Sequence, residues 1–289
     1  MTERLIRLGF RACIFLGFLF IFAPILSLIV FAFNEDRFPS LPWSGFSTRW
    51  FDAVFATPEF TSSLKNSLIV GAISALLATF LGGTAAYFLN RWDFRGKGVY
   101  LGIAVLPPCI PLVILGLALL IYLKEIGLSG SLKSVVISHV VLASAFSMGI
   151  VRMRLTEMDP ALEEAAWNLG ASQWRAIREV VLPQAAPAIL AAFLITMAVS
   201  WDEFIIAWFV SGLDVTLPVA IFNQLQGQVS ARINAIGTIV FGVTITLVVL
   251  AQVVLFVVAK TGRRRVGPGE AEAVAETTSE ADEALARGV

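Results

Sequence analysis

The amino-acid sequence predicts an all-α, polytopic membrane protein with six transmembrane helices. Of its 289 residues, 57% are hydrophobic and 15% are charged, and the mean hydropathy is +0.83. This composition is too apolar for a water-soluble domain. Apolar runs near or above the roughly 20 residues that cross a bilayer core occur at residues 9–33, 64–90, 99–123, 132–154, 184–210 and 233–259.

The ends of the chain differ from its middle. The first apolar run is long for a signal peptide and lacks an Ala-x-Ala cleavage site, so we expect a retained span. We therefore divide the chain into an N-terminal helix and outer loop (1–60), a transmembrane domain (61–260) and an acidic tail (261–289). The tail has almost no large apolar residue and is expected to be disordered in the cytoplasm.

The distribution of Lys and Arg predicts the orientation. With both termini in the cytoplasm, 15 of the 21 basic residues fall on the inner side, as the positive-inside rule requires. The polar segment 160–183, between the fourth and fifth apolar runs, then lies in the cytoplasm. Cys13 and Cys109 both lie in apolar runs, so neither a disulfide framework nor a metal site is expected.

Two of the predicted spans contain residues that affect helix geometry: prolines in the third and regularly spaced small residues in the second. The third contains Pro107, Pro108 and Pro111, which remove backbone donors and should kink the helix. The second places small residues at four-residue intervals, which permits close helix packing: Gly71, Ala75, Thr79 and Gly83.

Segment 160–183 predicts two short amphipathic helices outside the bilayer. Asp159 can cap the first helix, Gly170 can end it at positive φ, Ser172 can cap the second and Pro183 can stop it. On the first helix, one face is apolar and the other polar at 100° per residue. The apolar face carries Leu162, Ala165, Ala166 and Leu169, and the polar face carries Glu163, Glu164, Trp167 and Asn168.

This segment resembles the Glu-Ala-Ala loop of type I ATP-binding-cassette (ABC) importer membrane subunits. The resemblance rests on Glu164-Ala165-Ala166, then Gly170, then Val180-x-Leu182-Pro183, with Val180 where isoleucine is commonest. It implies the type I importer fold and a coupling helix that docks on a separate ATPase subunit. The docking residues it implies are Leu162, Glu164, Ala165, Ala166, Leu169 and Gly170.

Asp202 and Glu203 are adjacent acids within the fifth apolar run, next to Trp201 and followed by Trp208. Ionised carboxylates in a membrane are costly unless they meet a cation, water or a polar partner. A cationic substrate could supply that charge, and tryptophan rings could add cation–π attraction. The alternative is that one or both acids pair with a neighbouring helix. Because adjacent helical residues point about 100° apart, at most one acid should face a pathway squarely.

The surrounding segments resemble the second membrane subunit of spermidine/putrescine importers, through Ser200–Ile206, Phe209–Gly212, Thr216–Pro218 and Ile233–Thr238. The resemblance implies a permease for polyamines or related cations in a prokaryotic inner membrane. Its implied partners are an ATPase dimer, which carries the ATP and Mg, a second, different permease subunit, an extracytoplasmic binding protein and the lipid bilayer. We expect no cofactor in this chain and no nucleic-acid partner.

Other functions remain open. The solute could be another small organic molecule, or an ion-coupled secondary transporter could use Asp202, Glu203 and His139 as a proton relay. His139 has no acid at helical spacing on its own span, which favours a buried hydrogen bond. The chain lacks a Gly-x-x-x-x-Gly-Lys-Ser/Thr phosphate loop, so it is not expected to hydrolyse ATP by that route.

Overall fold

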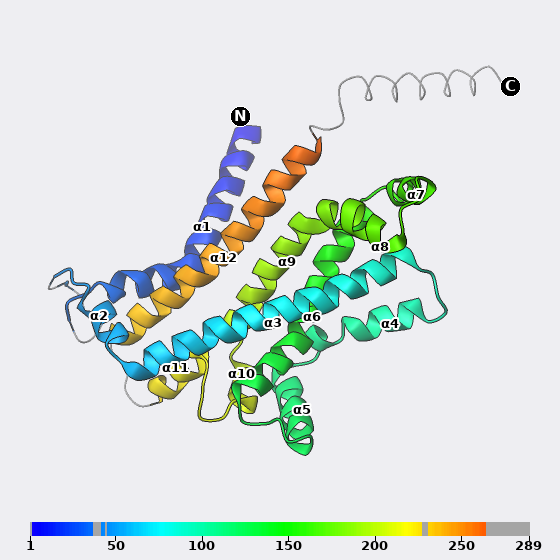
Figure 1. The fold of residues 1–289 in the computed structure, drawn as a ribbon. Helices are drawn as coiled ribbons and strands as arrows, with labels where there is room; N and C mark the ends of the chain where they lie inside the picture. Colours follow the sequence, from blue (N-terminus) through cyan, green and yellow to red (C-terminus); the bar gives the residue numbers. More distant parts are fainter. Residues whose placement is uncertain (1, 37–41, 44, 227–230, 264–289) are drawn as a thin grey trace.

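The computed structural model describes residues 2–36, 42–43, 45–226 and 231–263 (Figure 1). Over these residues the regular structure is helical apart from one isolated bridge between Asn34 and Phe46, which confirms the all-α prediction. The elements are α1 (Thr2–Ala32), α2 (Arg49–Phe55), α3 (Pro58–Arg91), α4 (Lys97–Ala104), the 3-10 turn Pro107–Cys109, α5 (Leu112–Glu125), α6 (Leu132–Thr156), α7 (Ala161–Asn168), α8 (Gln173–Ala176), the π-helix Ile177–Val181, α9 (Leu182–Asp202), α10 (Ile205–Val210), α11 (Leu217–Leu225) and α12 (Ala231–Arg263).

Five of the six predicted spans correspond to helices of the described chain that are long and apolar enough to cross a membrane. Their extents are Ile6–Ala32, Pro58–Arg91, Leu132–Thr156, Gln173–Asp202 and Arg232–Val257. The predicted tail lies, from residue 264 onward, outside the described residues.

The predicted span 99–123 is broken rather than kinked. Helix α4 ends at Ala104, Pro107 to Cys109 form a 3-10 turn, and α5 starts only after Pro111. Three prolines within five residues remove three backbone donors, so a continuous ladder cannot form there. The segment is therefore two separate helices, neither of them long enough to count as a span by itself.

Helices α3, α6 and α9 form the centre of the molecule, and α12 packs on α9 with α1 beside it (Figure 1). Helices α3 and α6 approach closely at Gly82, where a Cβ atom would lie 2.6 Å from the Ser144 carbonyl oxygen on α6. Gly71, Ala75 and Thr79 belong to the same buried face of α3. The predicted small-residue stripe is correct except that its last member is Gly82 instead of Gly83, whose Cβ would meet open space.

The second short helix continues into the next span, contrary to the prediction that Pro183 stops it. The chain passes from α8 through the π-helix directly into α9, and Pro183 is in the first turn of α9. Proline there lacks the N–H that an α-helical turn would use, and a widened π turn accommodates that loss. The predicted Ser172 cap is present, because its Oγ accepts from Arg175 N at 3.3 Å.

Candidate functional site

The predicted acidic pair lies at a break between two helices. Helix α9 ends at Asp202, Glu203 has extended backbone (φ −70°, ψ 118°), and α10 starts at Ile205. The prediction that both acids lie well inside a continuous span is therefore wrong.

Glu203 is buried, with 6% of its surface exposed, and both of its carboxylate oxygens are occupied. Oε1 accepts from the Ile206 backbone N–H at 2.8 Å, and Oε2 accepts from that of Ala207 at 2.9 Å. These N–H groups belong to the first turn of α10. The N–H groups of a first turn have no hydrogen-bond acceptor within their own helix. A carboxylate at this position accepts from both donors, and its negative charge is stabilised by the positive end of the helix dipole.

His139 from α6 supplies the third contact of Glu203. Its Nε2 lies 3.2 Å from Glu203 Oε2, and its Nδ1 lies 2.7 Å from the Ser200 hydroxyl on α9. The imidazole is 1% exposed. Ser200 can donate to Nδ1 of a neutral ring, and the Nε2–Oε2 pair is a close polar contact without the alignment of a hydrogen bond. The acid that pairs with His139 comes from another helix, so helical spacing on its own span could not identify it.

The side chain of Asp202 is exposed, unlike that of Glu203, and it contacts α12. The Thr244 hydroxyl of α12 donates to its carboxylate, at 2.9 Å from Oδ1 and 3.1 Å from Oδ2. That single hydroxyl leaves most of the carboxylate's acceptor capacity open. Both acids thus pair with a neighbouring helix, the alternative that the sequence left open: Glu203 with His139 of α6, and Asp202 with Thr244 of α12. They differ in exposure, because Glu203 is buried and Asp202 is exposed.

The two predicted tryptophans also differ. Trp201 is 1% exposed and packs in a buried cluster with Ala32, Val54, Phe60, Leu217, Ala235 and Ile236. Trp208 on α10 is 47% exposed and contacts Phe204 and Phe222, with ring centroids 6.5 and 6.0 Å away. Of these two tryptophans, Trp208 is the one that presents a ring face that a ligand could reach.

A second set of predicted residues lies on α7, the short helix that follows α6 in the chain. The apolar face is free: Leu162 is 46% and Leu169 is 89% exposed. Glu164 and Ala165 are also exposed, and Ala166 is half-buried. Gly170 has φ +85°, as predicted, and Ala171 N donates to Ala166 O at 3.0 Å, the hydrogen bond of a Schellman helix end.

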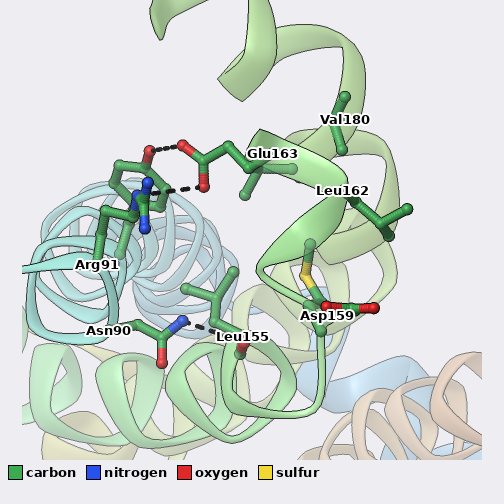
Figure 2. Close-up of a pocket in the computed structure, with 10 residues that line it drawn as sticks. Asn90, Arg91, Leu155, Asp159, Leu162, Glu163 and Val180 are labelled. Carbon is green, nitrogen blue, oxygen red and sulfur yellow. Dashed lines mark hydrogen bonds and ion pairs between the residues drawn. The ribbon is translucent and has the colours of Figure 1, made fainter. Parts of the chain in front are cut away.

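Two residues of the predicted polar face of α7, Glu163 and Trp167, turn toward α3, whereas Glu164 and Asn168 are exposed; the sequence did not indicate this division. Glu163 is 7% exposed and accepts from the Tyr87 hydroxyl at 2.9 Å, and its Oε2 lies 3.6 Å from Arg91 Nε (Figure 2). The Arg91 guanidinium in turn stacks 4.5 Å over the Trp167 ring. Tyr87 and Arg91 belong to the last turns of α3. A polar face at helical spacing does not reveal whether it meets water or another helix.

The two sites are of different kinds. One is a helix break in the membrane region that exposes a single carboxylate, and the other is a short helix outside it that exposes apolar side chains. Among the described residues, no three His, Cys, Asp or Glu side chains come together as metal ligands.

Comparison with known proteins identifies the family. Residues 78–266 match the family described as "Binding-protein-dependent transport system inner membrane component". The chain is 31% identical to the spermidine/putrescine transport system permease protein PotC of Escherichia coli (strain K12), over 88% of this chain and 95% of that protein. It is 33% identical to the putrescine transport system permease protein PotI of the same organism, over 78% and 83%.

The fold agrees with a crystal structure of a bacterial ABC transporter involved in import of the acidic polysaccharide alginate. The TM-score is 0.64 with 21% identity, over 91% of this chain and 96% of that one. The expected type I importer fold is thereby confirmed. This chain belongs to the binding-protein-dependent transport system inner membrane components, the multi-pass membrane subunits of ABC importers.

Proposed function

We propose that the chain forms half of the translocation pathway of an ATP-driven importer for polyamines, such as spermidine or putrescine, or for a related small organic cation. The names of PotC and PotI support this substrate class. The observation that carries the proposal is the exposed carboxylate of Asp202 at the break between α9 and α10.

An ionised carboxylate in a membrane-spanning region is expensive unless a cation or water compensates it. Thr244 supplies one hydroxyl to Asp202, which leaves room for ammonium groups of a passing polyamine. The half-exposed ring of Trp208, on the helix that follows the break, offers a cation–π surface. Glu203 does not share this role, because its oxygens are used by α10 and His139.

An ion-coupled relay through His139 and Glu203 fits the geometry less well. Both side chains are buried, and each carboxylate oxygen of Glu203 already accepts a hydrogen bond from a backbone N–H group. A proton carrier must reach water on alternate sides during its cycle. A pair that also holds a helix end together is better suited to a fixed structural role.

The free face of α7 supports an ATPase partner, and the family supports the others. Its exposed leucines suit docking on a soluble ATPase dimer, which would hold the ATP and Mg. A second, different permease would complete the pathway, and an extracytoplasmic binding protein would deliver substrate. This arrangement requires an inner-membrane location with both termini in the cytoplasm.

Two measurements on the reconstituted complex test the proposal. Uptake of radiolabelled putrescine or spermidine into proteoliposomes should require ATP, the binding protein and the ATPase subunit, and a proton gradient alone should not drive it. Replacing Leu162 and Leu169 by Asp should reduce co-purification of the ATPase, and Leu213→Asp, at a fully exposed apolar position between α10 and α11 and outside the candidate spans, should not. Uptake that persists without the ATPase would refute the proposal.

A further inference from the structure

The cytoplasmic helix α7 is joined to α3 almost entirely by side chains. Backbone packing between the two elements is slight, and the connection consists of Glu163 and Trp167 on α7 with Tyr87 and Arg91 on α3. Figure 2 shows Glu163 directed at the end of α3, away from the side of α7 that carries Leu162. The residues of this link are not among those proposed for the cation pathway, and Glu163 lies off the free docking face.

Glu163 is the centre of the link because each carboxylate oxygen has its own partner. Oε1 takes the Tyr87 hydroxyl, and Oε2 takes the Arg91 guanidinium. Arg91 occupies the last turn of α3, where a cation is favoured by the helix dipole, and it is held flat against Trp167. A buried acid on an otherwise exposed short helix is costly without such partners.

The C-terminal end of α3 is itself held against α6. Asn90 Nδ2 donates to the Leu155 carbonyl oxygen of α6 at 3.1 Å (Figure 2), and Leu89 packs in a buried cluster with Met148, Val151 and Leu155. A displacement of α7 therefore acts on α3 and α6 together. These are the two helices that cross at Gly82.

We infer that Glu163 is a positioning residue that transmits movement of α7 to the α3–α6 pair, and so couples events at the ATPase to the membrane helices. The inference rests on the proposed docking of α7. It differs from that docking because Glu163 faces the membrane helices. Loss of the link should leave ATPase binding intact and reduce the transport obtained from each ATP.

The test is Glu163→Gln in the full complex, with putrescine uptake and ATP hydrolysis measured in the same proteoliposomes. Glutamine keeps the shape but removes the charge that pairs with Arg91, and its NH2 group is a poor neighbour for a guanidinium. We expect normal ATPase co-purification and a fall in uptake per ATP of roughly 2- to 30-fold, the range for residues that carry coupling between sites.

Glu157→Gln is the matched control, because Glu157 pairs with Arg154 at 3.4 Å, is largely exposed and does not touch α3 in the contacts described. Its uptake per ATP should equal that of the parent. Equal ratios for Glu163→Gln and the parent would overturn the inference. If Glu163→Gln does not assemble, Tyr87→Phe decides: a lowered ratio supports the link and a parental ratio refutes it. Failure of the docking proposal would show separately, as ATPase co-purification that the Leu162 and Leu169 variants do not reduce.

Discussion

The imidazole of His139 on α6 meets the carboxylate of Glu203 at the α9–α10 break, with Nε2 and Oε2 3.2 Å apart. The same carboxylate accepts the first two N–H groups of α10 that reach it. The Glu203 side chain thus stabilises the end of α9, the start of α10 and the packing of both helices against α6. This arrangement leaves Asp202 on the exposed side of the break.

Glu203→Gln should therefore destabilise the protein. A glutamine has one acceptor oxygen, so a buried N–H of Ile206 or Ala207 loses its partner, at a cost of about 1–3 kcal/mol. The expected result is a lower thermal unfolding midpoint and a lower yield of monodisperse complex. Asp202→Asn is the control, since Asp202 is exposed and should assemble normally. A Glu203→Gln complex as stable as the parent would show that the capping contacts are dispensable.

Gly82 and Gly83 form a matched pair for the α3–α6 crossing. Gly82→Ala places a Cβ atom 2.6 Å from Ser144 O and 2.7 Å from Met148 N, so the helices must move apart. Overpacking of this kind costs typically about 1–3 kcal/mol. Gly83→Ala meets nothing within 4 Å and should be neutral or slightly stabilising. Thermal unfolding of both purified variants checks this, and equal midpoints would contradict the close crossing.

Gly170→Val should impair the helix end that presents α7. No atom would clash with the new Cβ, so the whole effect comes from φ +85°, which costs a β-branched residue on the order of 1–2 kcal/mol. We expect weaker ATPase co-purification or hydrolysis uncoupled from uptake. Gly170→Asn should be milder, because asparagine tolerates this conformation. Parental behaviour of the valine variant would argue against the turn's role.

Placement of 15 of the 21 basic residues on one side predicts a cytoplasmic C-terminus. A reporter enzyme that is active only outside the cytoplasmic membrane should be inactive when fused after Arg263. The same reporter fused after Gln226, between α11 and α12, should be active. The reverse pattern would invert the proposed orientation.

Local signals predicted the local structure well. Gly170 has the positive φ expected of it, Ser172 caps its helix, and the prolines after Ala104 interrupt the third apolar run. In each case the residue acts on its own backbone or on backbone within three or four residues of it, so the local sequence contains the whole cause. Pro183 is the exception, because a π turn let the helix continue through it.

The contacts between distant segments could not be predicted in the same way. His139 finds Glu203, and Glu163 finds Tyr87 and Arg91, only once helices have packed. Periodicity placed Glu163 and Glu164 on one polar face of α7, but Glu163 is buried against α3 and Glu164 is exposed, so it did not tell which side of the helix meets the membrane helices. Similarly, the break after Asp202 has no proline or glycine to announce it; the tertiary contacts of Glu203 stabilise it.

The most direct test of the central claim is the concentration dependence of spermidine and putrescine uptake by the complete complex with Asp202→Asn. The variant keeps the shape and a hydrogen-bonding oxygen for Thr244 but removes the negative charge. We predict normal assembly and an apparent KM raised about tenfold, equivalent to about 1.4 kcal/mol, or a matching loss of uptake rate. Parental rate and apparent KM for both polyamines, in a fully assembled complex, would contradict a role for Asp202 in the cation pathway.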